Sequence, residues 1–190
     1  PPLYSSAASD VYTSQAPDRP GAGAVAMYHR EEGIWVSAGL VMPDVTSGVF
    51  GFGRRLSLSG DRLLVGALNL PDENGPLEAW VFKREGSEWV QEAILAAGEE
   101  ELVHDNFGIA VAISGSFAVV GSSMPYTDQL LLPGAAYLFE LVGGEWSFVA
   151  KLTAAEGGKA EGFGEALSMD GGRVVVGAWS KDNKQGAVYT

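Results

Sequence analysis

Residues 107–122 read FGIAVAISGSFAVVGS, and this stretch decides the fold because two other parts of the chain repeat its landmarks. Each copy begins with Phe-Gly, and the three copies start at Phe52, Phe107 and Phe163. Each copy then reaches a Val-Gly step, whose Val follows the Phe by 13 residues at Val65, Val120 and Val176. A fixed period of about 55 residues predicts a repeat architecture made of similar units.

Four strand-like segments recur in the same order. The first begins at Phe-Gly and alternates small with large residues, and the second is apolar at nearly every position. The third carries an aromatic residue, and its copies are Gly23–Tyr28, Leu77–Phe82, Gly134–Phe139 and Gly186–Tyr189. The fourth begins at Trp35, Trp89 and Trp146. Alternation with period 2 and short apolar runs bounded by turns both predict strands, so we expect an all-β fold.

Helical periodicity is not sustained anywhere, although Glu92–Glu101 could form a helical turn between two units. Sheets of four strands that are covered on both faces and repeat at a constant period are best explained as β-propeller blades. A β-helix would need a shorter period, and a sandwich would not need identical units. Trp80 and Trp179 are expected to pack between blades, as are Trp35, Trp89 and Trp146.

Composition limits the classes of partner. The chain has 190 residues, 46% of them hydrophobic, with 26 Gly, and it has no Cys for disulfides or thiolate metal sites. It contains no run of 18 apolar residues, so we expect no membrane span, and no signal peptide is visible. The net charge of −12 argues against a nucleic-acid partner, whose phosphates need a basic surface.

The chain resembles the FG-GAP repeat family, which includes the propeller of integrin α subunits. The resemblance lies in four landmarks in a fixed order: Phe-Gly, then Val-Gly-Ala, then Gly-Ala-Val-Tyr, then a Trp-led strand. The resemblance implies a β-propeller with blades of four antiparallel strands and an extracellular or cell-surface location. The units would be 3–51 (degenerate), 52–106, 107–162 and 163–190 (incomplete). Three interpretations stay open: a segment of a larger propeller, a four-bladed ring with reduced terminal blades, and a partial ring completed by self-association.

Calcium-binding members of that family carry an Asp-x-Asp/Asn-x-Asp-Gly loop between the first and second strands. In this chain the same connections are Ser59-Gly60-Asp61, Ser114-Gly115-Ser116 and Asp170-Gly171-Gly172. These are hairpin-sized turns, and a Ca²⁺ ion needs six to eight oxygen ligands from a loop long enough to surround it. We therefore expect no metal and no cofactor at these turns.

The longer connections, which join the second to the third strand and the fourth strand to the next unit, share the opposite end of each sheet. Long loops on a rigid scaffold commonly carry function. The candidate ligand-binding residues there are Asp72, Glu73, Asn74, Glu100, His104, Asp105, Tyr126, Asp128, Asp182 and Asn183. Leu130, Leu131 and Leu132 are a candidate protein contact. The acidic character of this face has two explanations: a solvated rim, or a surface for cations or basic partners.

No Ser/His/Asp arrangement is legible, and no carboxylate is expected at a recurrent inner-strand position. Arg54 and Arg55 interrupt the small residues of the inner strand, and they could meet an anion or pair with a neighbouring acid. We expect a non-enzymatic binding or adhesion module for a protein or glycan ligand. The alternatives are a structural subunit of an extracellular or surface assembly, and a carbohydrate-active or lectin-like propeller.

Overall fold

The computed structural model describes residues 23–44, 51–67, 78–96, 106–123, 134–155 and 162–190, with Asn183 and Lys184 described by their backbone alone. The elements within these ranges are β1 (Val25–Glu31), β2 (Ile34–Val41), β3 (Arg55–Ser59), β4 (Arg62–Gly66), β5 (Glu78–Glu85), β6 (Glu88–Ala96), β7 (Phe107–Ser114), β8 (Phe117–Ser122), β9 (Ala135–Val142), β10 (Glu145–Leu152), β11 (Phe163–Asp170), β12 (Arg173–Ala178), α1 (Lys181–Lys184) and β13 (Ala187–Tyr189). None of the helices in these ranges is long and apolar enough to span a bilayer.

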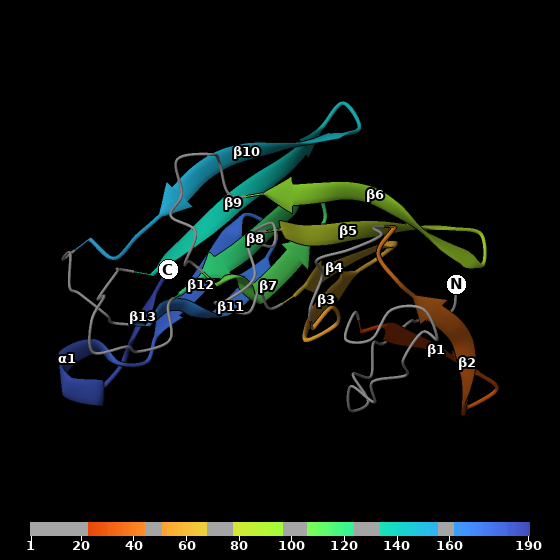
Figure 1. The fold of residues 1–190 in the computed structure, drawn as a ribbon, viewed down its shortest axis with the longest axis horizontal. Coiled ribbons are helices and arrows are strands. Elements are labelled where there is room, and N and C mark those ends of the chain that lie inside the picture. Colours follow the sequence, from red (N-terminus) through yellow and green to blue (C-terminus); the bar gives the residue numbers. More distant parts are fainter. Residues whose placement is uncertain (1–22, 45–50, 68–77, 97–105, 124–133, 156–161) are drawn as a thin grey trace.

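The strands form four antiparallel sheets in chain order. The first has β1 and β2, the second runs β3-β4-β5-β6, the third runs β7-β8-β9-β10, and the fourth runs β11-β12-β13. The predicted all-β fold is confirmed, and the sheets have the form of propeller blades and part-blades in a ring that is not closed. Figure 1 shows them following one another along the long axis, from β1 and β2 to the sheet of β11–β13.

Each hairpin within a sheet closes with a turn of two residues. The first-to-second-strand turns are Gly60-Asp61, Gly115-Ser116 and Gly171-Gly172. The glycine that opens each of them has a positive φ, between 54° and 60°. That conformation matches the twist of the flanking strands in a tight hairpin and is open to glycine at little cost. The connections are therefore as short as the sequence indicates.

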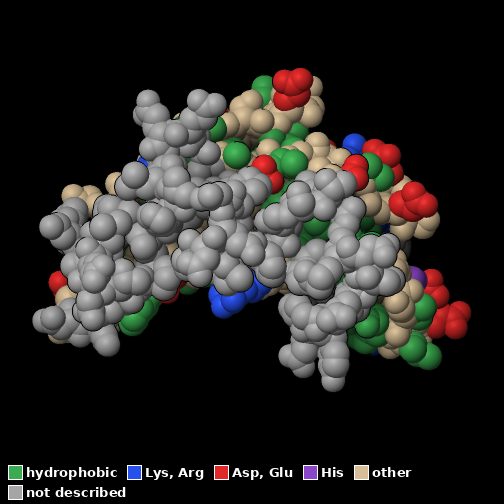
Figure 2. Space-filling view, viewed as in Figure 1, with side chains coloured by type: hydrophobic (Ala, Val, Ile, Leu, Met, Phe, Trp, Pro, Cys, Tyr) green, Lys and Arg blue, Asp and Glu red, His purple; other side chains and the backbone are tan. Residues whose placement is uncertain are grey.

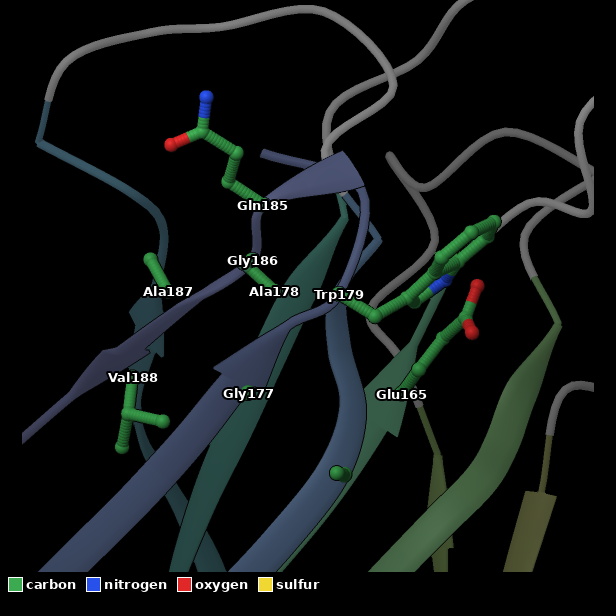
Figure 3. A pocket seen from close by; sticks show the side chains of 9 residues that line it. Glu165, Gly177, Ala178, Trp179, Gln185, Gly186, Ala187 and Val188 are labelled. Carbon is green, nitrogen blue, oxygen red and sulfur yellow. The ribbon is translucent and has the colours of Figure 1, made fainter. Parts of the chain in front are cut away.

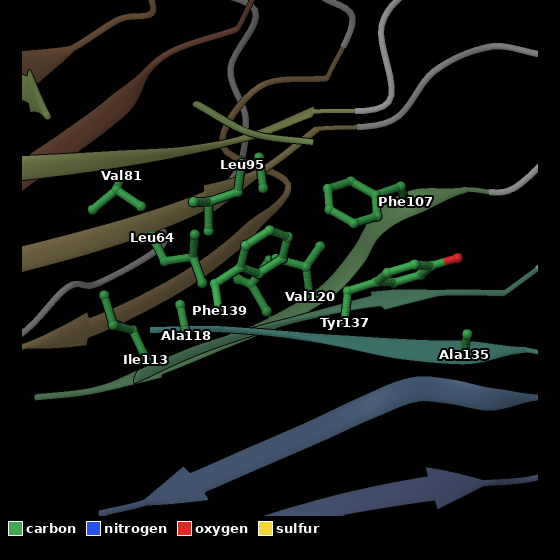
Figure 4. Close-up of a cluster of buried hydrophobic side chains, with 12 residues drawn as sticks. Leu64, Val81, Leu95, Phe107, Ile113, Ala118, Val120, Ala135, Tyr137 and Phe139 are labelled. Carbon is green, nitrogen blue, oxygen red and sulfur yellow. The ribbon is translucent and has the colours of Figure 1, made fainter. Parts of the chain in front are cut away.

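The hydrophobic core lies between successive sheets. One buried cluster joins Leu64, Val81 and Leu95 of the second sheet to Phe107 and Val120 of the third, and Figure 4 shows these side chains meeting between the strands. Two further clusters occupy the junctions of the first with the second sheet and of the third with the fourth. Both faces of the second and third sheets are consequently covered, which explains why their strands lack the polar face of an exposed sheet.

The inner strands of neighbouring sheets are aligned by serine hydroxyls near the hairpin turns. Ser59 Oγ accepts a hydrogen bond from the backbone N–H of Gly115 at 3.2 Å, and Ser114 Oγ accepts one from Gly171 at 2.9 Å. These bonds bring the two-residue turns of three successive sheets to one end. Because connections alternate between the two ends of an antiparallel sheet, the strand ends that carry the longer connections lie at the other end.

A charged group links the second sheet to the third. Arg62 donates two hydrogen bonds to the Glu92 carboxylate, at 2.8 and 2.9 Å, and Trp146 Nε1 donates a third at 2.9 Å. Burial alone would raise the pKa of Glu92, but the hydrogen bonds from Arg62 and Trp146 outweigh it and hold that pKa below its ordinary value. Glu92 therefore contributes to stability in its ionised form.

The Glu92→Gln variant is expected to lose about 1–3 kcal/mol of unfolding free energy at neutral pH, because an amide cannot accept the paired Arg62 bonds. A folded-state pKa below the unfolded one gives stability that is present at neutral pH and lost as pH falls through the folded value. The difference between wild type and variant should thus shrink below about pH 4.5. Urea denaturation at several pH values measures it, and a difference that stayed constant into acid would contradict this role.

Two expectations need correction. Glu92–Ala96 is part of strand β6, so the helical turn is wrong over that stretch. Trp80 is buried as expected, but Trp35 and Trp179 are 52% and 49% exposed rather than packed between sheets. The outer strand β2 has exposed residues along nearly its whole length.

Candidate functional site

Most of the predicted site residues lie outside the described residues. This applies to Asp72, Glu73, Asn74, Glu100, His104, Asp105, Tyr126 and Asp128, and to the apolar group Leu130, Leu131 and Leu132. The described strand ends nevertheless place the origins of these connections at the same end of the second and third sheets. For these residues the binding face stays a prediction.

The fourth sheet has a described connection at this end. It joins β12 to β13 and contains α1. Asp182 is exposed and has a φ of 52°, and Asn183 follows it in the same short helix. Lys181 Nζ donates to the Tyr189 hydroxyl at 2.9 Å, and Gly186 N–H donates to the Lys181 carbonyl at 3.0 Å. These two bonds hold the connection against β13.

An open cavity of about 740 Å³ lies beside this connection. Its lining comes from the three strands of the sheet and from the connection: Glu165 and Ala166 of β11, Gly177 and Ala178 of β12, Ala187 and Val188 of β13, and Trp179, Gln185 and Gly186. In Figure 3 the Glu165 and Trp179 side chains extend on one side of the cavity and Val188 on the other. The lining is thus mainly apolar and backbone, and its polar side-chain groups are the Glu165 carboxylate, the Gln185 amide and the Trp179 indole N–H.

Glu165 is a residue that the sequence interpretation missed. It follows Phe163-Gly164 directly, at the position held by Arg54 in one copy and Ile109 in another. The expectation that no carboxylate occupies a recurrent inner-strand position is therefore wrong. Glu165 Oε1 accepts a hydrogen bond from Ser123 Oγ of the preceding unit at 3.1 Å. Comparing the residue after each Phe-Gly would have revealed it.

Arg55 also differs from the expected anion contact or acid pair. Its Nε donates to the backbone carbonyl of Ile109 at 2.7 Å, and its Nη1 donates to the Arg54 carbonyl at 3.1 Å. The Ile109 bond crosses from the second sheet to the third. Arg55 is accordingly a link between neighbouring inner strands, made through backbone oxygens.

Exposed carboxylates are distributed over several hairpins of the described residues. Within the described ranges, no group of three or more His, Cys, Asp or Glu side chains is placed to hold a metal ion. Exposed acids lie at the outer hairpins, where Figure 2 shows acidic side chains at the edge of the molecule; they are Glu31, Glu32, Glu85, Glu88 and Glu145. The acidic surface thus extends beyond the predicted face to the outer hairpins.

Comparison with known proteins adds one finding. A family model described as FG-GAP repeat matches residues 89–139 and 146–190, which together are just over half of the chain. No curated protein matches the sequence. The matched ranges begin at or next to Trp89 and Trp146, so each covers an outer strand together with the inner strands that follow it.

Proposed function

The chain belongs to the FG-GAP repeat family, and from that premise we propose that it is a non-enzymatic binding module for a protein or glycan ligand. FG-GAP repeats form propeller-type binding or structural modules and are typical of extracellular or surface proteins. The proposal adds a location outside the cell or on its surface, and a ligand that contacts the long connections. It assigns no catalytic residue, metal or cofactor.

One observation carries the proposal: every described hairpin turn has two residues, whereas the connections at the other strand ends are much longer, such as 67–77 and 123–134. The inner strands beneath them are fixed by inter-sheet hydrogen bonds and by three buried clusters. A rigid scaffold with long connections at one end is the arrangement by which many binding proteins position variable loops. Binding through this face is thus better supported than binding through the hairpin end.

A second candidate function is a structural subunit of a surface assembly. The observation that favours it is a group of exposed apolar residues on β2, in which Ile34, Trp35 and Leu40 are each more than half exposed. Exposed apolar groups of this kind are common at contacts between proteins. Concentration-dependent association in sedimentation velocity, without an array ligand, would favour this candidate over the first.

The binding proposal can be tested with labelled protein on glycan and protein arrays. A loop variant neutralises three acids of the predicted face: Asp72→Asn, Glu73→Gln and Asp128→Asn. A hairpin variant neutralises three exposed acids of the outer hairpins: Glu85→Gln, Glu88→Gln and Glu145→Gln. The two variants change the net charge equally, so only position separates them. We expect the loop variant to weaken binding to a specific array ligand by about tenfold or more, as for the loss of a central interface contact.

The hairpin variant should bind within about twofold of wild type, because exposed charges outside an interface contribute little at physiological salt. Equal weakening by both variants would instead identify a nonspecific charge effect. Binding that only the hairpin variant loses would place the site at the opposite end and overturn the proposal.

A further inference from the structure

Each Phe-Gly step in the described residues inserts into the same kind of site on the preceding sheet. In the third sheet this site, here called the socket, consists of Gly121, Ser122, Gly134 and Ala135, and it receives Phe163-Gly164. The second sheet receives Gly108 on Gly66 and Ala67, and the first receives Phe52-Gly53 on Gly23 and Ala24. Three sockets are therefore occupied by the inner strand of the following sheet.

The socket of the third sheet admits its occupant because its two glycines have no Cβ atom. A Cβ atom at Gly121 would overlap the Gly164 carbonyl oxygen, and one at Gly134 would overlap that of Phe163. Gly66 is in the same relation to the carbonyl oxygen of Gly108. Neither Gly121 nor Gly66 has a positive φ, so close backbone approach is the reason for glycine at these positions.

The fourth sheet carries a further copy of the socket. Phe163 pairs with Ala178 as Phe107 pairs with Ser122, and Gly177 pairs with Val188 as Gly121 pairs with Ala136. The four residues of the third sheet's socket thus have counterparts in the fourth sheet, which are, in the same order, Gly177, Ala178, Gly186 and Ala187. All four line the 740 Å³ cavity. The cavity is the space that a Phe-Gly step fills in the other sheets.

Burial along the same sheet face supports this correspondence. Val119 and Ala136, which face the following sheet, are fully buried at 0% exposure. Their counterparts Val175 and Val188 are 36% and 71% exposed. The chemistry of the face is the same in both sheets, namely small and β-branched apolar residues. The face of the fourth sheet is thus built like an interface although nothing described covers it.

The polar contact at the far end of the strand also has a counterpart. Ser59 and Ser114, the eighth residues from their Phe, accept a hydrogen bond from the turn glycine of the next inner strand. Asp170 holds the corresponding place and is exposed. A carboxylate accepts such an N–H bond at least as well as a hydroxyl. Asp170 can therefore align an occupant's hairpin turn.

We propose that the fourth sheet is an acceptor for the Phe-Gly-led inner strand of a further FG-GAP unit, which inserts its Phe-Gly step into the socket of Gly177, Ala178, Gly186 and Ala187. The occupant is specified by what the three occupants of the filled sockets share: a Phe, a Gly with a positive φ, and a turn that opens with Gly. This inference concerns the sheet face and is independent of the ligand proposed for the long connections.

The probe is a synthetic peptide with the sequence of residues 162–172, which starts with Gly-Phe-Gly and ends in the Gly-Gly turn. Titrating it into the ¹⁵N-labelled full chain and following amide resonances detects binding even at millimolar affinity. We expect saturable shifts at Gly177, Gly186 and Ala187. A peptide with Phe163→Ala should bind at least about tenfold more weakly, because it lacks the ring that is buried at each of the three filled junctions between sheets.

Matched glycine variants of the protein complete the test. Gly177→Ala places a methyl group where the described counterparts, Gly66 and Gly121, have none. Within the chain this Cβ meets Ala166 Cβ at 3.1 Å, a contact that needs only a small adjustment. Gly172→Ala is the control, since its Cβ has no atom within 4 Å. We expect Gly177→Ala to weaken peptide binding at least about tenfold and Gly172→Ala to leave it unchanged.

Val188→Glu, at an exposed position, provides a second blocking variant if Gly177→Ala disturbs the fold. Absence of shifts at the socket, or equal affinity in wild type and both blocking variants, overturns the proposal. Self-association that disappears in Gly177→Ala, without peptide binding, also overturns it and identifies a second copy of this chain as the occupant. The loop variant with Asp72→Asn, Glu73→Gln and Asp128→Asn should bind the peptide as wild type does, which keeps this result separate from the ligand-binding proposal.

Discussion

Replacing Gly121 with alanine is expected to lower the free energy of unfolding by about 3 kcal/mol or to prevent folding, although it adds a single methyl group. The added Cβ would overlap the carbonyl oxygen of Gly164, which is backbone and cannot turn aside as a flexible side chain can. The third and fourth sheets would have to separate, and Phe163, Val176 and Ala178 would lose part of their burial against Val119. Chemical denaturation followed by circular dichroism measures the loss.

Gly172→Ala is the matched control for this prediction. It makes the same chemical change in the turn between β11 and β12, at a glycine without a positive φ and with open space around its Cβ position. The control should stay within about 0.5 kcal/mol of wild type, as is usual for surface substitutions. Equal stability of the two variants would show that the sheets do not approach each other through Gly121.

The order of strands and the end that carries long connections could be predicted from sequence because both follow from the spacing of a few landmarks. A Gly-rich or charged turn shortly before a Trp marks the start of each outer strand. The strands β2, β6 and β10 begin one residue before that Trp, at Ile34, Glu88 and Glu145. The turns at Gly60, Gly115 and Gly171 are short because the Phe-to-Val interval leaves no room for more.

The role of the Phe-Gly glycine could not be predicted from one chain. Gly53, Gly108 and Gly164 share a φ of 90–94°, and the pairing of β7 with β8 and of β11 with β12 shifts at this step. The sequence shows the glycine but not the irregularity that turns the Phe ring toward the preceding sheet. Since the socket combines residues from two strands and an adjacent sheet, periodicity along one strand does not reveal it.

The candidate site was predictable only in part, for a related reason. Sequence spacing separates long from short connections, but it does not place side chains within the long ones. The alternation of small residues along the inner strand does not determine the residue after Phe-Gly, which is Arg54, Ile109 or Glu165 in the three copies. Trp35 and Trp179 were assigned to packing by residue type, whereas their exposure depends on which strands lie beside them.

Phe107→Ala should cost about 3–5 kcal/mol of unfolding free energy, the range for deletion of a buried aromatic ring. Phe107 is 1% exposed, and it lies edge-on to Tyr137 and Phe139 with centroid distances of 5.3 and 6.4 Å. It also belongs to the cluster that contains Leu64, Ala79 and Leu95 of the preceding sheet. Its removal would leave a cavity between two sheets, which backbone contacts at Gly66 prevent from closing. Urea denaturation gives the size of the loss.

Phe148→Ala is a demanding control because Phe148 contacts the same two rings, at 5.9 Å from Phe139 and 6.4 Å from Tyr137. It lies on the outer strand β10 and is 56% exposed, so water already replaces much of its packing and the loss should be below about 1.5 kcal/mol. A large difference between the two variants would show that the repeated Phe stabilises the junction between sheets rather than the sheet that contains it. Comparable losses would mean that aromatic contacts within the third sheet dominate, and that the Phe-Gly step does not anchor one repeat to the next.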